Sequence, residues 1–289
     1  MSALLLLAVL AGAGATFATE APSTAHRPAD DLQEQLLLHG EVVDAREAKT
    51  GVTRSTVATL QRDGLVHAAH VQVVDEYKAT HRLAGLTEMD FRDSWRGNVA
   101  AYRLDRLLGL HMVPVSVRRS YRGKLAAFTW WLDEVLMTDG ERHQRRVRIP
   151  DPEAWERERQ VVRVFDQLIY NTDCNQGNLL IDEQWRLWMI DHTRAFKVFG
   201  ELPDTAALGV QCEKDLLAAL RSLDRAALEA AVGDVLGSGQ IKGLLARRDR
   251  IVQYYDAQLA ALGTARVLYD LPPRAAPARR APADAVRRQ

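Results

Sequence analysis

Cysteine is scarce in this sequence, and its scarcity limits the kinds of site that the chain can build. Only Cys174 and Cys212 occur among 289 residues. Two cysteines cannot form a structural zinc site alone, and the eight histidines show no metal-ligand spacing. In an oxidising compartment the two thiols could form one disulfide, and the alternative is a pair of unrelated free thiols.

A net charge is also lacking, because 38 basic residues balance 38 acidic ones. No overall field would attract nucleic acid, so no specific nucleic-acid partner is expected. Lysine is rare among the basic residues, which are mostly arginine. Each of the six lysines can be judged singly as a phosphate ligand: Lys49, Lys78, Lys124, Lys197, Lys214 and Lys242.

Long apolar runs are missing except at the start, where residues 1–18 read "MSALLLLAVLAGAGATFA". A run of about 15 apolar residues is short for a membrane span. Its small-residue end is typical of a secretory signal, although a basic first region is absent. No cysteine follows, which excludes a lipoprotein anchor. We expect a leader and export to the periplasm or beyond; the alternatives are an uncleaved anchor and a cytoplasmic protein with a misplaced start codon.

Two polar segments flank the part of the chain that can form a core. Residues 19–35 begin "TEAPSTAHRPADDL" and are expected to form a linker. Residues 269–289 are rich in proline and arginine and are expected to form a disordered basic tail. A solvated tail is the simplest interpretation, and weak contact with an anionic surface is the alternative.

The first half of the remaining chain is rich in strand signals. Val-rich runs separated by turn residues predict three strands, at 41–48, 55–63 and 65–74. A helix is predicted over 93–110, capped by Asp93 or Ser94 and ended by Gly109. Residues 113–132 then predict two strands about the turn "YRGK".

The second half is mainly helical. Asp151 and Pro152 are typical of a helix start, so a helix is predicted over 151–170. Three further helices are expected at 211–223, 225–237 and 241–262. Strands followed by helices indicate an α+β fold of two lobes.

Between these helices lies "NLLIDEQWRLWMID" (178–191), which predicts a β-hairpin with its turn at 182–184. Antiparallel pairing would bring Asn178 and Asp191 together at the open end. Asp173 lies five residues earlier, close enough to fold over the same place. Three oxygen-bearing side chains are therefore expected to converge there.

Three such side chains in one place suit phosphoryl transfer. A carboxylate and an amide oxygen can hold Mg²⁺ or Mn²⁺, and a second carboxylate can orient the attacking hydroxyl. The alternative is structural, with Asp173 and Asn178 as turn formers and Asp191 as a strand-end cap.

The segment "VFDQLIYNTDCNQGNLLIDEQWRLWMIDHTRAF" (164–196) resembles the catalytic segment of atypical kinases. These are bacterial relatives of the secretory-pathway protein and proteoglycan kinases, and more distantly of HipA-type and phosphatidylinositol kinases. "DFRDSW" (90–95) and "VAAYRLDRLLGLHMVPVSVRR" (99–119) resemble the helix and following strand of the same family's first lobe. The resemblance covers about residues 38–215 and implies a two-lobed protein-kinase-like fold, with lobes at 36–133 and 134–268.

The resemblance also implies roles for single residues. Asp173 takes the place of the catalytic aspartate, and Asn178 and Asp191 take the places of the metal ligands. ATP or another NTP is the implied nucleotide. Four further residues are expected to contact it, the first two in a phosphate-covering turn and the others in the hinge beside the adenine: Gly51, Thr53, Trp131 and Asp133. An ordinary hairpin turn and ordinary strand packing are the respective alternatives.

The sequence departs from the kinase pattern where a lysine and a glutamate usually hold the phosphates. Gln72 stands at the lysine position and Asn98 at the glutamate position, and the two could hydrogen-bond to each other. Lys78 could instead reach into the cleft, although an exposed lysine is the simpler interpretation. Cys174 stands where relatives usually carry arginine.

These features predict transfer of the ATP γ-phosphoryl group to a hydroxyl of a protein or glycan acceptor. The neutral pair Gln72 and Asn98 keeps open a pseudokinase or scaffold. A small-molecule phosphotransferase, with a similar trio of side chains, is a further alternative. A purely structural exported protein is the last.

Overall fold

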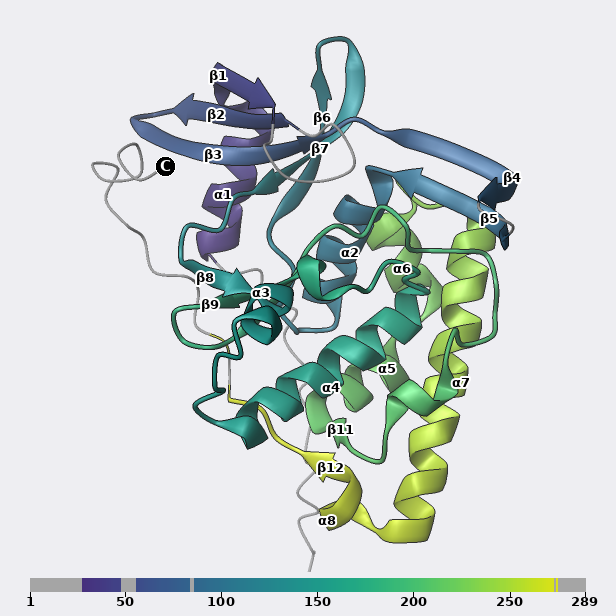
Figure 1. Ribbon diagram of the computed structural model, residues 1–289. Coiled ribbons are helices and arrows are strands. Elements are labelled where there is room, and N and C mark those ends of the chain that lie inside the picture. The colour runs from purple at the N-terminus through teal and green to yellow at the C-terminus, as the bar shows by residue number, and fades with distance from the viewer. Residues whose placement is uncertain (1–27, 48–55, 84–85, 273, 275–289) are drawn as a thin grey trace, which may run out of the picture.

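Five antiparallel strands form the main sheet of the first lobe, in the order β1–β2–β3–β7–β6 (Figure 1). Their bounds are β1 (Glu41–Glu47), β2 (Thr56–Arg62), β3 (Leu65–Gln72), β6 (Ser116–Tyr121) and β7 (Lys124–Trp130). The computed structural model describes residues 28–47, 56–83, 86–272 and 274. Gly51 and Thr53, predicted to cover phosphates, lie outside the described residues.

Two tight turns set the register of this sheet. Asp63 and Gly64 join β2 to β3 with φ of 51° and 80°, and Arg122 and Gly123 join β6 to β7 with φ of 50° and 79°. Two successive residues with positive φ match the right-handed twist of the flanking strands. The five predicted strands are confirmed, although β3 ends at Gln72 rather than at residue 74.

A helix precedes the sheet where a linker was expected. Helix α1 (Pro28–His39) packs against the sheet through Leu36 and Leu37, which are 2% and 0% exposed. Asp30 near its start pairs with Arg106 at 2.7 Å. The linker prediction is therefore wrong for residues 28–35, because the two leucines at the end of this polar stretch dock on the sheet.

Helix α2 (Arg96–Leu107) confirms the predicted helix of the first lobe, although it starts at Arg96 rather than at residue 93, and the hydroxyl of Ser94, one of the two predicted caps, accepts from the Arg96 N–H at 3.3 Å. Its N-cap is Trp95, which gives no side-chain cap. Asp93 and Ser94 belong instead to strand β5 (Leu86–Ser94), opposite Glu76 and Asp75 of β4 (Asp75–Leu83). This β4–β5 hairpin was not predicted, and it projects from the first lobe toward the helices of the second (Figure 1).

The second lobe combines a small sheet with a helical body. Strands β8 (Val135–Thr138), β9 (Leu179–Asp182) and β10 (Leu187–Met189) form the sheet. The longest of its helices, α4 and α7, pack against each other. The helices of this lobe are α3 (Asp139–Gln144), α4 (Pro152–Ile169), α5 (Lys214–Ser222), α6 (Arg225–Val232), α7 (Ser238–Leu262) and α8 (Thr264–Val267), with short 3₁₀ turns η1 (Gln176–Asn178) and η2 (Thr205–Leu208).

The predicted helix starts of this lobe follow from capping chemistry. The Asp151 carboxylate accepts hydrogen bonds from the backbone N–H groups of Glu153 and Ala154, and Pro152 occupies the first helical position of α4. These groups satisfy N–H donors that the helix itself cannot pair. Within the described residues, no helix is long and apolar enough to cross a membrane.

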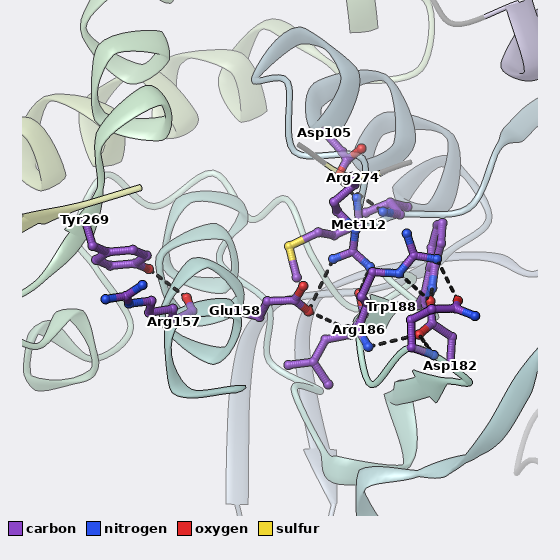
Figure 2. A network of polar contacts seen from close by, with 12 residues as sticks. Asp105, Met112, Arg157, Glu158, Asp182, Arg186, Trp188, Tyr269 and Arg274 are labelled. Atoms are coloured by element: carbon purple, nitrogen blue, oxygen red, sulfur yellow. Dashed lines mark hydrogen bonds and ion pairs between the residues drawn. The ribbon is translucent and has the colours of Figure 1, made fainter. Parts of the chain in front are cut away.

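Residues 268–269 and Arg274 make contacts that the composition of this region did not indicate. Strand β12 (Leu268–Tyr269) pairs with β11 (Cys212–Glu213), and the Tyr269 hydroxyl donates to the Arg157 carbonyl at 2.7 Å. Arg274 donates to the Leu187 carbonyl at 2.7 Å and lies over the Trp188 ring (Figure 2). The predicted tail, which began at residue 269, is therefore wrong for its first residues. Residues 275–289 lie outside the described part.

The two cysteines do not meet. Cys174 is exposed and Cys212 is buried, and both are free thiols. The structure therefore supports two unrelated thiols rather than a disulfide.

Candidate functional site

The β9–β10 hairpin is present as predicted, and its register places Asn178 opposite Ile190, the residue before Asp191. Leu179 pairs with Met189, and the next residue outward, Ile190, donates its N–H to the Asn178 carbonyl at 3.0 Å. At the other end, the Asp182 carboxylate accepts from the backbone N–H groups of Gln184 and Arg186 and from the Trp188 indole (Figure 2). These bonds close the turn and fix the register that carries the site.

Asp173 is held by a relay of amides in the loop between α4 and η1. The Asn171 amide donates to the Asp166 carboxylate at 2.8 Å, and its oxygen accepts from the Asp173 N–H at 3.0 Å. Asn175 then donates to Oδ1 of Asp173 at 2.8 Å. The carboxylate of Asp173 is thereby oriented, and its Oδ2 is the atom left for another partner.

Asn178 contacts Asp173 directly. Its Nδ2 donates to the Asp173 carbonyl oxygen at 3.0 Å. Since the amide nitrogen is used in this way, the amide oxygen Oδ1 is the atom that can face a ligand. The structure thus places the Asn178 amide against the Asp173 backbone and the Asn178 backbone against Ile190, the residue before Asp191; convergence of the three side chains stays a prediction.

Asp191 adopts a left-handed conformation with φ of 56°, which aspartate tolerates better than most residues. Its Oδ1 accepts from the Thr193 hydroxyl at 3.1 Å. The next N–H, of His192, donates to Oδ1 of Asn98 on α2 at 2.7 Å. Asp191 is therefore positioned by groups on both lobes.

Asn98 consequently has a different role from the one expected. Its oxygen binds His192, and among the described residues no hydrogen bond joins it to Gln72, so their predicted pairing is wrong. The adjacent Gly97 allows this approach of α2, because a Cβ there would lie 2.1 Å from the His192 carbonyl oxygen. Gln72 is buried at the end of β3. Lys78 on β4 is half-buried, pairs with Glu76 at 3.1 Å and lies with its Nζ over the Phe91 ring, so a role at the phosphates stays a prediction.

The electrostatics around Asp191 fit a cation. Oδ1 of Asp93 is buried and has no hydrogen-bond partner among the described residues. Burial raises the pKa of Asp93, a Thr193 hydrogen bond opposes this, and repulsion from Asp191 adds to it. Burial lowers the pKa of His70, and the nearby negative charge of Asp191 opposes that shift. A positive ion would relieve the repulsion between these carboxylates.

The Asp191 carboxylate and the Asn178 amide oxygen are donors that suit Mg²⁺ or Mn²⁺. No group of three His, Cys, Asp or Glu side chains able to hold a metal occurs in the described part of the chain. A metal held by Asn178 and Asp191 would therefore need further oxygens from phosphate or water, as Mg²⁺ usually does.

The expected hinge residues lie in the segment that joins β7 to β8, between the lobes. The Trp131 N–H donates to the Ala68 carbonyl at 3.2 Å, and the Trp131 side chain is 37% exposed. Asp133 accepts from His67 at 2.8 Å, and the His67 ring stacks on Trp130. Contact of this segment with an adenine ring stays a prediction.

The residues that orient Asp173 and Asp191 were not predicted from the sequence. Asp166, Asn171 and Asn175 orient Asp173, and Thr193 orients Asp191. A possible signal was the density of asparagine just after a helix end, in "YNTDCNQGN", because asparagine side chains often bond to nearby backbone.

Comparison with known proteins places this geometry in a known fold. No family model matches the chain, and no curated protein matches it. Among solved structures, a hydra Fam20 with sugar matches with a TM-score of 0.63 at 13% identity, covering 82% of this chain and 90% of that one. The Golgi casein kinase matches with a TM-score of 0.60 at 14% identity, covering 84% and 80%.

The same Golgi casein kinase with Mn/ADP bound matches with a TM-score of 0.58 at 15% identity, again covering 84% and 80%. At such identities these likenesses show the fold. The chain has a protein-kinase-like fold of the type seen in Fam20 and the Golgi casein kinase, with a β-rich first lobe and a helical second lobe.

Proposed function

We propose that the protein is a metal-dependent phosphotransferase that moves the γ-phosphoryl group of ATP to a hydroxyl group on a protein or glycan. The contact between Asn178 and Asp173, close in the hairpin to Asp191, supports this most directly. The Asn178 amide donates to the Asp173 carbonyl oxygen at 3.0 Å, and the Asn178 carbonyl accepts from the N–H of Ile190, the residue before Asp191. An acidic residue for the acceptor beside oxygen ligands for a metal is the combination that phosphoryl transfer requires.

Asp173 would orient the acceptor and take its proton. Asn175 occupies Oδ1, so Oδ2 can accept the acceptor hydroxyl. During transfer the hydroxyl oxygen bonds to the γ-phosphorus, the bond to the bridging oxygen breaks, the proton passes to Asp173, and ADP leaves. A positioned base of this kind contributes roughly 10² to 10⁴ in rate.

Asn178 and Asp191 would hold Mg²⁺ or Mn²⁺. Thr193 occupies Oδ1 of Asp191, so Oδ2 and the Asn178 oxygen are the ligand atoms. The bound metal supplies positive charge against the phosphates. The Golgi casein kinase of similar fold was solved with Mn/ADP, which supports this choice of metal and nucleotide class.

A pseudokinase is the second candidate, because two specific residues favour it. Gln72 and Asn98 are both neutral, and Asn98 is occupied by the His192 N–H. The usual lysine for the α- and β-phosphates therefore has no counterpart at this position. Such a protein could bind nucleotide in the cleft and act as a scaffold without transferring phosphate.

The test is transfer of labelled phosphate from ATP with Mg²⁺ or Mn²⁺, using a serine- and threonine-containing peptide library and a set of proteoglycan oligosaccharides. We expect Asp173→Asn to lower the rate at least about 100-fold while nucleotide affinity stays unchanged. Asp256→Asn, at an exposed residue paired with Arg221 on the far helices, is the matched control. Nucleotide binding without transfer by the unmodified protein would reject the proposal in favour of the pseudokinase.

A further inference from the structure

The β4–β5 hairpin holds the segment that follows Asp191. The Glu88 carboxylate on β5 accepts from Nη2 of Arg194 and from Nζ of Lys197, both at 2.6 Å. Lys197 is 3% exposed and also donates to the Met89 carbonyl at 3.2 Å. One carboxylate of the first lobe therefore binds two cations of segment 193–198.

Further contacts from β5 flank this ion pair. Asp90, which is 6% exposed, accepts from the Val198 N–H at 2.9 Å and is itself held by Arg92 at 2.8 Å. Closer to Asp191, the Ser94 N–H donates to the Thr193 carbonyl at 3.0 Å. The segment is thus bound to β5 at its beginning, middle and end.

The other side of segment 193–198 is fixed to the second lobe. The Thr172 hydroxyl, next to Asp173, donates to the Arg194 carbonyl at 3.0 Å. The Phe196 N–H donates to the Ile169 carbonyl at 2.6 Å, and Arg247 donates to the Lys197 carbonyl at 3.1 Å. The segment therefore connects the β4–β5 hairpin to the loop that carries Asp173.

An anion that pairs with the basic residues of segment 193–198 can hold that segment in place. Segments beside kinase sites can be ordered when a phosphate is added and pairs with basic residues. Here Thr193 is the only hydroxyl residue in the sequence from 192 to 199, and it is 4% exposed and bonded to Asp191. The anion that pairs with Arg194 and Lys197 is a carboxylate already present in the chain.

We propose that Glu88 is a positioning residue: through Arg194 and Lys197 it fixes segment 193–198, so that Asp191 faces Asp173 and Asn178 without any modification of the segment. Its catalytic consequence rests on the proposed function, whereas its hold on the segment does not. Removing the charge of Glu88 would leave Lys197 buried without its ion-pair partner, which favours opening of the segment.

The test compares amide hydrogen exchange in the full protein and in Glu88→Gln. We expect exchange of the Thr193–Val198 amides to be at least about tenfold faster in the variant, with the α7 amides unchanged as proof that the fold is retained. Glu229→Gln is the control, because it removes an exposed ion pair with Arg225 at 3.0 Å in α6. Equal exchange of segment 193–198 in all three proteins would overturn the proposal.

Calorimetric titration with Mn²⁺ and ADP separates a positioning role from a merely structural one. We expect about tenfold weaker binding in Glu88→Gln and unchanged binding in Glu229→Gln. Faster exchange with unchanged Mn–ADP affinity would reject the positioning role. Failure of the unmodified protein to bind Mn–ADP would reject the proposed function instead, and the exchange comparison would still decide whether Glu88 holds the segment.

Discussion

Ionising the buried carboxyl group of Asp166 costs free energy, and a neutral side chain would remove this cost. Burial raises its pKa to about 6, although the Asn171 amide bonds to the carboxylate and opposes the shift. Above pH 6 the folded protein must hold a charged group that water would solvate better. Because asparagine can still accept the Asn171 hydrogen bond, we expect Asp166→Asn to raise the free energy of unfolding at pH 8 by roughly 2 kcal/mol.

The size of this stabilisation by Asp166→Asn depends on pH. Between about pH 4 and 6 the folded protein binds more protons at Asp166 than the unfolded chain does, so the wild type gains stability as pH falls through this window. The advantage of Asp166→Asn should therefore shrink toward pH 4. Urea unfolding at pH 8 and pH 4.5 measures the difference in stability between Asp166→Asn and the wild type, with Asp256→Asn as the control. A difference of the same size at both pH values would show that the carboxyl is not the cause.

Single residues were predictable where their partners lie nearby in sequence. Asn178 and Asp191 could be grouped because they flank a short hairpin, and Asp173 because it lies five residues before Asn178. The role of Asn98 could not be predicted, since its partner is a backbone N–H 94 residues away. The need for glycine at position 97 could not be predicted either, because the carbonyl oxygen that leaves no room for a side chain belongs to the distant His192. Such long-range contacts depend on the packed fold rather than on a local pattern.

Among the elements, the strands and long helices with clear apolar periodicity were predicted, whereas the β4–β5 hairpin and helix α1, with polar sequences, were not. The β4–β5 hairpin is "DEYKATHRL" and "LTEMDFRDS", with charges in both strands, and ion pairs and hydrogen bonds join it to the second lobe. Helix α1 begins with polar residues and turns apolar only near its end. In both cases tertiary contacts outweigh local sequence preference.

The packing of helix α1 against the sheet can be tested by substitution. We expect Leu37→Ala to lower the free energy of unfolding by about 2 to 5 kcal/mol, because Leu37 is fully buried against the sheet. Leu32→Ala in the same helix is the matched control, since Leu32 is 37% exposed and should cost less than about 1 kcal/mol. Urea unfolding measures both, and equal effects would contradict the docking of α1.

At the scale of the whole molecule, the chain end reinforces the second lobe. Arg274 reaches the Leu187 carbonyl of the hairpin and the Glu158 carboxylate of α4, at 2.7 and 3.4 Å (Figure 2). We expect Arg274→Ala to cost about 1 to 3 kcal/mol, because Glu158 is largely buried and would lose its cation. Thermal unfolding beside Arg225→Ala, at an exposed pair, checks this, and equal midpoints for the two variants would contradict it.

The lobes themselves meet around Asp191, which is bonded to Thr193 and followed by the N–H that binds Asn98 of α2. The two-lobed arrangement could be predicted from the order of strands and helices, with the resemblance to kinases. The contacts between lobes could not, because they join β5 and α2 to segment 191–198 across about 100 residues of sequence.

The central claim is that the protein binds a nucleotide through a metal at Asp191. The most direct measurement is a thermal-shift titration with ATP, ADP and GTP, each with Mg²⁺, Mn²⁺ or EDTA. Asp191→Asn is the variant to use, because asparagine tolerates the left-handed backbone of this position. Ligand at about 100 times its dissociation constant stabilises a fold by roughly 2.7 kcal/mol, enough to raise the midpoint by a few degrees.

The account predicts a rise in the midpoint that requires both nucleotide and metal and that disappears in Asp191→Asn. Asp256→Asn should keep the full rise, because Asp256 pairs with Arg221 away from the cleft. No rise under any condition, or an equal rise in Asp191→Asn, would contradict the claim.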